Sequence, residues 1–136
     1  MAKCSGDCTS FTPSSSTSWF KIAEAGEKEP GTPNTWAQAD LNTGAPADVT
    51  LPSDLAPGNY LIRHEIIALQ NAQSEGGAEF YPSCLQVKVS GNENGSPNTS
   101  VHFPGAYSAT DAGLLGNVSY SVNFSPCFLL TRCSVL

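Results

Sequence analysis

Residues 58–84 read GNYLIRHEIIALQNAQSEGGAEFYPSC, and this stretch decides the fold of the chain. Tyr60–Leu69 is rich in apolar residues and alternates poorly, which predicts a strand covered on both faces, with Ile66–Leu69 as a buried run. The pair Gly76-Gly77 then interrupts the apolar pattern, as expected of a loop. An aromatic-Pro-Cys corner ending at Cys84 leads into a second strand. The stretch therefore predicts two strands joined by a polar loop.

Length and composition predict one domain of short strands. The chain has 136 residues, enough for one core, and only 13% of them are charged. Further strands are predicted at Trp19–Ile22, at Asp48–Pro52 and at Leu85–Val89, the last with one buried and one solvated face. Trp36–Ala47 is predicted to be irregular, and the sequence has no apolar stripe of helical period. These patterns favour an all-β fold, an antiparallel β-sandwich of the immunoglobulin or fibronectin kind with long loops.

The charge balance indicates which partners to expect. Twelve acidic and six basic residues give a net charge of −6, which argues against nucleic acid, because phosphates require basic patches. An acidic domain is compatible with a neutral polymer such as a polysaccharide. No apolar run approaches the roughly 20 residues that a membrane span needs, so we expect no membrane insertion. We expect a monomer.

Cysteines and glycosylation sequons indicate a secreted protein. The chain has five cysteines, and Asn-x-Ser/Thr sequons begin at Asn94, Asn98, Asn117 and Asn123. The alternative is chance, since Asn, Ser and Thr are abundant. Met1–Cys4 does not begin a signal peptide, because no apolar h-region follows it. Together these features predict that an N-terminal segment precedes this chain in the complete protein.

Cys4 and Cys8 are separated by Ser-Gly-Asp. This spacing can close a tight disulfide-bonded loop, in which Gly6 relieves backbone strain. Two free thiols or half of a metal site are the alternatives. Because no second paired motif occurs, we do not expect zinc.

Several motifs, in order along the chain, resemble the fungal lytic polysaccharide monooxygenases of auxiliary activity family 9, formerly glycoside hydrolase family 61. The matching segments are MAKC at 1–4, WFKI at 19–22, LAPGNY at 55–60, RHEIIAL at 63–69 and FPGAY at 103–107. The resemblance covers residues 1–116. It implies that these residues are the C-terminal part of the family's β-sandwich domain, a partial sandwich that lacks the N-terminal part.

The resemblance implies copper chemistry. In the family, a histidine brace holds copper through the amine and imidazole of the N-terminal His and through a second His, and open positions take dioxygen or peroxide. The family oxidises cellulose or related β-glucans at carbon 1 or carbon 4, outside the cell, with an electron donor or peroxide. Both brace histidines belong before the strand that ends at Cys4, so we expect this chain to lack them. Of its own histidines, we expect His64 to be a hydrogen-bonded core residue and His102 to face solvent.

Three residues correspond to positions around the copper. Tyr81 matches the tyrosine that is the axial neighbour of the metal; a buried aromatic anchor is the alternative. Gln70 stands where the family usually has His, and Glu79 stands where it usually has Gln, so two groups that would hydrogen-bond the bound oxygen species are altered. Gln70 can donate a hydrogen bond but cannot titrate, whereas Glu79 can carry a proton. An ordinary polar strand end and a solvated loop acid are the respective alternatives.

The resemblance also assigns three cysteines. Cys4 and Cys8 match the family's short disulfide. Cys84 matches a cysteine whose partner lies far upstream, so we expect it to be unpaired here. Loss of such a bridge typically costs about 2–5 kcal/mol in a small secreted domain.

Residues 117–136, NVSYSVNFSPCFLLTRCSVL, do not resemble the family. Val118-Ser119 can be encoded by a typical intron donor, so we hypothesise a tail derived from a retained intron. In that case Cys127 and Cys133 are accidental.

The leading interpretation is a partial copper-dependent polysaccharide monooxygenase that lacks its histidine brace and is inactive as given. One alternative is a non-catalytic carbohydrate-binding or decoy domain. Another is a gene-model fragment that does not fold, because missing strands would leave unpaired sheet edges and an exposed core.

Overall fold

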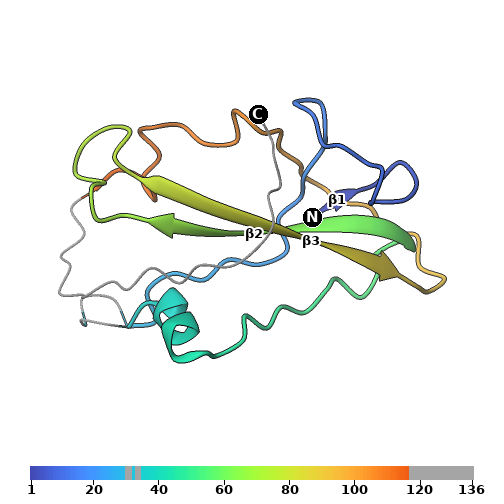
Figure 1. Ribbon diagram of the computed structural model, residues 1–136, viewed down its shortest axis with the longest axis horizontal. Coiled ribbons are helices and arrows are strands. Elements are labelled where there is room, and N and C mark those ends of the chain that lie inside the picture. The colour runs from blue at the N-terminus through green and yellow to red at the C-terminus, as the bar shows by residue number, and fades with distance from the viewer. Residues whose placement is uncertain (30–31, 33–34, 117–136) are drawn as a thin grey trace.

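The computed structural model describes residues 1–29, 32 and 35–116. The regular elements are β1 (Ala2–Lys3), η1 (Ala37–Thr43), β2 (Gly58–Ala68) and β3 (Glu79–Val89). The strands form one antiparallel sheet in the order β1-β2-β3 (Figure 1), so the predicted all-β class is confirmed. The predicted tail 117–136, with its two cysteines and two sequons, lies outside the described residues.

β2 and β3 form a long hairpin because both are rich in residues that favour strands. Each strand has 11 residues, and the pairing runs from Gly58 opposite Val89 to Ala68 opposite Glu79. The second strand thus starts before the predicted Pro-Cys corner. Pro82 is compatible with it because β3 is an edge strand within the described sheet.

Two short pairings continue the sheet beyond β1. The amine of Met1 donates to the carbonyl of Phe20 at 2.6 Å, and the N–H of Phe20 donates to the carbonyl of Met1 at 2.9 Å. Trp19 and Val101 form an isolated antiparallel bridge. The predicted strand Trp19–Ile22 therefore pairs only at its first two residues, and the rest of it is unpaired chain within the described structure.

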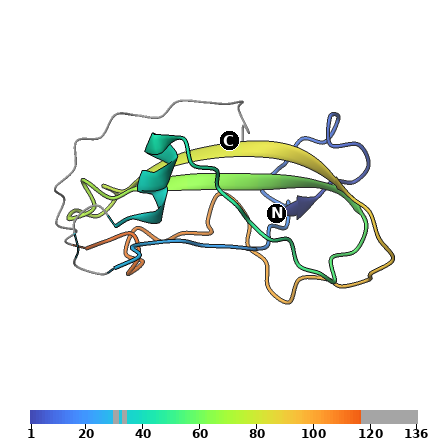
Figure 2. The ribbon, with the colours of Figure 1, turned by 90° about the horizontal axis from the view of Figure 1, so that it is seen from below.

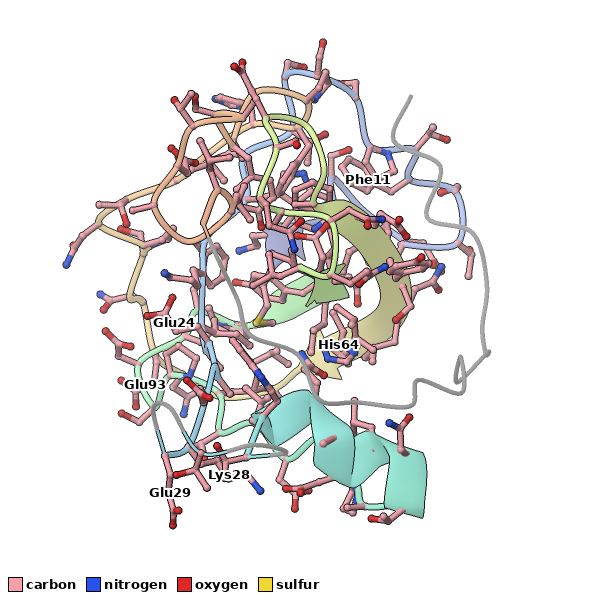
Figure 3. All side chains as sticks on the ribbon, turned by 90° about the vertical axis from the view of Figure 1, so that its left-hand side faces the viewer. Phe11, Glu24, Lys28, Glu29, His64 and Glu93 are labelled. Carbon is pink, nitrogen blue, oxygen red and sulfur yellow. A yellow bond between two sulfur atoms is a disulfide. The ribbon has the colours of Figure 1, made fainter. Side chains whose placement is uncertain are left out.

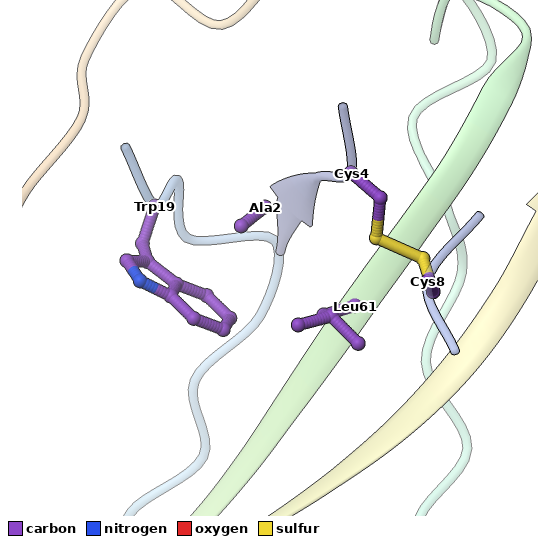
Figure 4. Close-up of a cluster of buried hydrophobic side chains, with 5 residues drawn as sticks. All are labelled: Ala2, Cys4, Cys8, Trp19 and Leu61. Atoms are coloured by element: carbon purple, nitrogen blue, oxygen red, sulfur yellow. A yellow bond between two sulfur atoms is a disulfide. The ribbon is translucent and has the colours of Figure 1, made fainter. Parts of the chain in front are cut away.

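The hairpin has two faces, because successive side chains of a strand point to opposite sides. We call the face that carries Leu61 and Cys84 the disulfide face. A cluster of buried residues covers it near β1 (Figure 4), and its members are Ala2, Cys4, Cys8, Trp19 and Leu61. Residues 104–116 run along one side of the hairpin in Figure 2. Full burial of a side chain such as Leu61 contributes about 1.5–3 kcal/mol.

We call the opposite face, which carries Tyr60 and Tyr81, the tyrosine face. Near β1 it packs into a second cluster, formed by Met1, Leu55 and Tyr60 with the half-buried Phe20, Ile22, Ile62, Val87 and Val89. Toward the hairpin loop it is open: Tyr81 is 55% and Leu85 is 50% exposed. The predicted burial of Leu85 is therefore wrong, and the predicted buried run Ile66–Leu69 is only half-buried. On the tyrosine face, other segments thus cover the sheet near β1, whereas Tyr81 and Leu85 stay exposed toward the loop end.

Two predictions for residues 36–52 are wrong. Ala37–Thr43 forms a 3-10 helix instead of irregular chain, and Gly44 ends it with φ 85°, donating its N–H to the carbonyl of Leu41 at 3.1 Å. Asp48–Pro52 is not a strand. Its apolar residue Val49 is 47% exposed, and the segment pairs with no strand of the described sheet.

Candidate functional site

The cluster of polar side chains that best fits a functional site lies where the hairpin loop meets β3. The Oη of Tyr81 donates to Oε2 of Glu79 at 2.5 Å, and Nδ2 of Asn71 lies 3.3 Å from Oε1 of Glu79. One carboxylate thus accepts from a phenol and an amide. The hydrogen bond to Glu79, followed by the charge of Glu79, raises the pKa of Tyr81. Tyr81 is exposed, so it is not a buried anchor.

The loop geometry explains why Asn71 reaches Glu79. A Cβ on Gly77 would lie 1.8 Å from the carbonyl oxygen of Asn71, so only glycine allows this approach of the two backbone segments. Gly76 has φ 75°, in the left-handed region that favours glycine. The Gly-Gly pair therefore folds the loop tightly against residue 71. Gln70 lies at the start of this loop and is exposed.

A second polar group lies on the disulfide face at the same end. Arg63 and Glu65 form an ion pair, with side chains 13% and 8% exposed. Tyr107 donates its Oη to Oε2 of Glu65 at 2.6 Å, and the guanidinium of Arg63 lies 4.2 Å from the ring centroid of Phe103. Burial, and then the hydrogen bond to Glu65, raises the pKa of Tyr107 to about 12.

Two aromatic rings form a ridge between two depressions. Phe80 and Tyr107 stack with centroids 5.2 Å apart and an interplanar angle of 21°. Both rings line a depression of about 290 Å³ that also contains Arg63 and Glu65, and both line a second of about 190 Å³ on the side of Leu114. Phe80 is 38% and Tyr107 is 43% exposed. Because Phe80 and Tyr81 are neighbours on a strand, this ridge and the Tyr81 phenol lie on opposite faces.

The two histidines of the chain belong to different parts of the structure. His64 lies on the tyrosine face of β2 opposite Ser83, and its side chain points to the side on which η1 lies (Figure 3). His102 is exposed, as predicted, and its Nδ1 lies 3.0 Å from the carbonyl of Thr17. Among the described residues no group of three or more His, Cys, Asp or Glu could hold a metal ion. The side chains around Tyr81 are oxygen and amide groups, so they do not fit the nitrogen ligand set that copper requires.

Of the two predictions about disulfide pairing, one is confirmed and one is wrong. Cys4 and Cys8 form a disulfide with Cα atoms 5.5 Å apart, as predicted. Cys84 is also in a disulfide, so the expectation that it is unpaired is wrong. The expectation considered only a partner upstream of the chain, whereas a thiol can pair with any cysteine that the fold brings within reach.

The sequence does not predict Asn71 and Tyr107 as hydrogen-bonding partners. Tyr107 enters the sequence-based predictions only through the FPGAY motif. Period-two alternation does place Glu65 and Phe80 on one face, but it cannot show which loop covers that face. For Asn71 the Gly76-Gly77 pair is a usable signal, since two glycines mark a close approach of backbone segments.

Comparison with known proteins gives close similarity to one group. The chain is 52% identical over 115 residues to AA9 family lytic polysaccharide monooxygenase D of Gloeophyllum trabeum, covering 84% of this chain and 33% of that protein. It is 43% identical over 118 residues to AA9 family lytic polysaccharide monooxygenase B of Malbranchea cinnamomea, covering 87% of this chain and 47% of that protein. The sequence pattern of Auxiliary Activity family 9 (formerly GH61) matches residues 1–126. The chain belongs to Auxiliary Activity family 9.

Solved structures agree with the family. The extended catalytic domain of LPMO9A from H. jecorina superposes with a TM-score of 0.75 at 38% identity, covering 92% of this chain and 50% of that one. Cel61B from Hypocrea jecorina, a glycoside hydrolase family 61 member, gives 0.74 at 34% identity, with coverages of 93% and 57%. The predicted partial antiparallel β-sandwich is therefore confirmed.

The family 9 chain spans a third to about half of the length of the curated relatives quoted above. The predicted end of the family part at residue 116 stays a prediction. In the part of the chain that the structure describes, no helix is both long and apolar enough to cross a membrane.

Proposed function

We propose that this family 9 chain serves in the oxidative cleavage of cellulose or a related β-glucan, at carbon 1 or carbon 4, by a secreted copper-dependent polysaccharide monooxygenase. The observation that carries the proposal is the exposed phenol of Tyr81, held by Glu79 at the loop end of the hairpin. By its resemblance to the family, Tyr81 would be the tyrosine beside the copper, and this supports the proposal. The activity of the relatives, named as lytic polysaccharide monooxygenases, supports the reaction class.

The described residues would have two roles in this reaction. They would hold polar groups in place beside the reaction centre, and they would hold or pass a proton there. Glu79 accepts from Tyr81 and from Asn71, so its carboxylate is fixed beside the phenol. A fixed carboxylate can hold or pass a proton beside a reaction centre. Gln70, which lies exposed at the start of the same loop, can donate a hydrogen bond there but cannot titrate.

We propose further that the 136 residues alone do not form the copper site. Their two histidines, His64 and His102, belong to different elements, and the described acids and cysteines do not complete a ligand set. The imidazoles of the brace would therefore be supplied together with these residues in a complete enzyme.

The test joins the chain to the N-terminal part of the Gloeophyllum trabeum relative at the residue that aligns with Met1. We expect the 136-residue chain, given copper, ascorbate and swollen cellulose, to release no oxidised oligosaccharides in mass spectrometry. The chimera should bind one copper ion with the electron paramagnetic resonance spectrum of a histidine brace and release oxidised products. Its Tyr81→Phe variant, which keeps the ring but removes the hydroxyl, should release them more slowly. A folded chimera that binds copper and releases no oxidised product would contradict the proposal.

A second candidate function is non-catalytic carbohydrate binding. The exposed ridge of Phe80 and Tyr107 favours it, because aromatic rings offer an apolar surface to the C–H face of a sugar. Adsorption of the 136-residue chain to crystalline cellulose should then be independent of copper and should fall in the Phe80→Ala variant. Adsorption that requires copper would count against this candidate.

A further inference from the structure

We propose that Asn98 is a site of N-linked glycosylation and that the neighbouring sequon at Asn94 is not. The proposal concerns a modification and goes beyond the proposed function. It depends on passage through the secretory pathway and not on copper or glucan.

Both sequons lie in the loop that connects β3 to the bridge at Val101. Residues 90–94 and 96–100 are exposed, and the loop is at the far right end of the hairpin in Figure 1. Only Gly95 is half-buried. Exposure alone therefore does not distinguish Asn94 from Asn98.

The sequon of Asn94 is fixed to the protein through its middle residue. The N–H of Gly95 donates to the carbonyl of Asp54 at 2.8 Å, and Gly95 forms a parallel bridge with Leu55, which is buried. A Cβ on Gly95 would lie 2.4 Å from the carbonyl oxygen of Asp54, so the backbones are in tight contact. To enter the active site of a transferase, this tripeptide would have to break the pairing. Asp54 precedes it in the chain and is available for pairing as soon as Gly95 emerges.

Proline restricts the same sequon further. Ser96, whose hydroxyl completes the Asn94 sequon, precedes Pro97. The residue before a proline is confined to extended backbone, which limits the turn that brings the hydroxyl toward the asparagine amide. The Asn98 sequon ends at Ser100 and is followed by Val101, so it has no such restriction.

The sequon of Asn98 is free to leave the surface. Within the described structure, residues 98–100 make no side-chain hydrogen bond and no backbone–backbone hydrogen bond. The next fixed residue is Val101, which exchanges hydrogen bonds of 2.9 and 2.7 Å with Trp19. Asn98, Thr99 and Ser100 therefore form an exposed segment that can bend outward without loss of a hydrogen bond.

The modification is a group transfer from a lipid-linked oligosaccharide diphosphate. The Nδ2 of Asn98 forms a bond to carbon 1 of the first sugar and loses one proton to a base of the transferase. The bond between that carbon and the diphosphate oxygen breaks, and the lipid diphosphate leaves with the electron pair. No oxidant or reductant is needed.

A glycan at this loop would leave the candidate site open. Tyr81 and Val89 are separated by eight residues of strand, which at about 3.3 Å per residue is about 26 Å. The sugar would project from the opposite end of the hairpin, so the group of Tyr81, Glu79 and Asn71 stays accessible to a polymer.

The test directs the full 136-residue chain into the secretory pathway of yeast with a heterologous signal peptide. Cleavage after Glu93 and Asp111 gives a peptide of residues 94–111, which contains both sequons and separates them from those beyond residue 116. Peptide N-glycosidase in heavy-oxygen water, applied to the unfolded chain before this cleavage so that Asn94 is still internal, converts each glycosylated Asn into labelled Asp, and fragmentation locates the label. We expect the label at Asn98. The Asn98→Gln chain should lose the mass of one glycan, whereas the Asn94→Gln chain should keep its glycan.

Two further arms keep the outcome decisive. Ser100→Ala keeps the asparagine but destroys the sequon, and it should remove the same glycan. If the yeast retains the chain, translation into microsomes gives the same readout before export. A glycan on residues 94–111 that persists in Asn98→Gln, or an unmodified peptide 94–111 in a translocated chain, would overturn the proposal. Neither readout involves copper, so failure here is distinct from failure of the proposed monooxygenase function.

Discussion

The phenol of Tyr81 and the carboxylate of Glu79 are hydrogen-bonded partners two residues apart on one face of β3, with Oη and Oε2 at 2.5 Å. The pair lies at the strand end that adjoins the hairpin loop, and Asn71 contacts the second carboxylate oxygen from that loop. This contact joins the two strand residues to a residue of the hairpin loop.

Glu79→Gln should lower the pKa of Tyr81 toward its ordinary value near 10. The side-chain amide keeps an acceptor for the phenol but removes the negative charge that opposes formation of tyrosinate. The measurement is tyrosinate absorbance against pH, with Tyr81→Phe subtracted to isolate this residue. Glu75→Gln, in the same exposed loop, is the matched control and should change nothing. A Tyr81 titration that is identical with and without Glu79 would contradict the assignment.

Tyr107→Phe should lower the free energy of unfolding by about 1.5–3 kcal/mol, the cost of one hydrogen bond to a charged acceptor. The ring and its stack on Phe80 are retained, so the loss reports the bond to Glu65 alone. Urea denaturation at neutral pH measures it. Tyr81→Phe, at an exposed phenol, should cost less. Equal losses in the two variants would show that the Glu65 bond contributes no more than a surface contact.

Stability should fall as pH rises from 10 to 12, and Tyr107 contributes to this loss beside Tyr60 and Tyr81, whose pKa values are also raised. The folded-state pKa of Tyr107 is raised to about 12, whereas an unfolded tyrosine titrates near 10, so in this window the folded state holds a proton that the unfolded state has lost. The expected loss is on the order of 1 kcal/mol, less than the full shift implies, because the residue is 43% exposed and solvent screens the interaction. In Tyr107→Phe the alkaline slope should become shallower. Denaturation at a series of pH values provides the comparison.

Gly77→Ala should distort the hairpin loop and destabilise the fold by about 1–3 kcal/mol, as overpacking does. The added methyl would lie 1.8 Å from the carbonyl oxygen of Asn71, so the loop must open. The change should also shift the pKa of Tyr81, since Asn71 would move away from Glu79. Gly113→Ala, where a Cβ meets nothing within 4 Å, is the control. If both variants melt at the same temperature, the close approach is not a constraint.

Replacing both Cys4 and Cys8 by serine should cost about 2 kcal/mol, the loop entropy of a crosslink across so short a segment. Both sulfurs belong to the buried cluster on the disulfide face, so packing is lost as well. Thermal unfolding of the double variant against the parent, with and without reductant, measures the effect. Reductant should lower the stability of the parent more than that of the double variant, because only the disulfide of Cys84 remains to be reduced in the variant. A parent that is insensitive to reductant and equal in stability to the variant would contradict this prediction.

The sequence predicts the parts of this fold that depend on local pattern. The run Tyr60–Leu69 identified β2 within two residues at its start, and the Cys4–Cys8 spacing identified a disulfide. Asp48–Pro52 has the composition of a strand but no partner in the described sheet, and pairing is a property of tertiary structure. The disulfide of Cys84 depends on which cysteine the fold brings close to it. The spacing of cysteines along the sequence does not predict their distance in space.

At the candidate site, residue types and strand faces can be predicted from the sequence, whereas contacts between side chains cannot. Glu79 and Tyr81 share a face by alternation alone, so their hydrogen bond was foreseeable. The contact between Asn71 and Glu79 could not be predicted, because it depends on how residues 69–78 fold back on themselves. Tyr107 lies in a motif far along the chain, and its bond to Glu65 depends on the path of residues 104–116 over the sheet.

The alternation of Phe80 and Tyr81 restricts where this gene can gain or lose codons. Deleting one residue of β3 between Tyr81 and Val87 would turn the phenol toward the aromatic ridge and Phe80 toward open solvent, while the pairing with β2 near Val89 stayed in register. Homologous chains should therefore keep a constant strand length here and concentrate their insertions and deletions in residues 90–100, beyond the last paired residue of the hairpin. The positions of insertions and deletions in related sequences therefore test the two-faced arrangement of the hairpin, and this test requires no protein to be made.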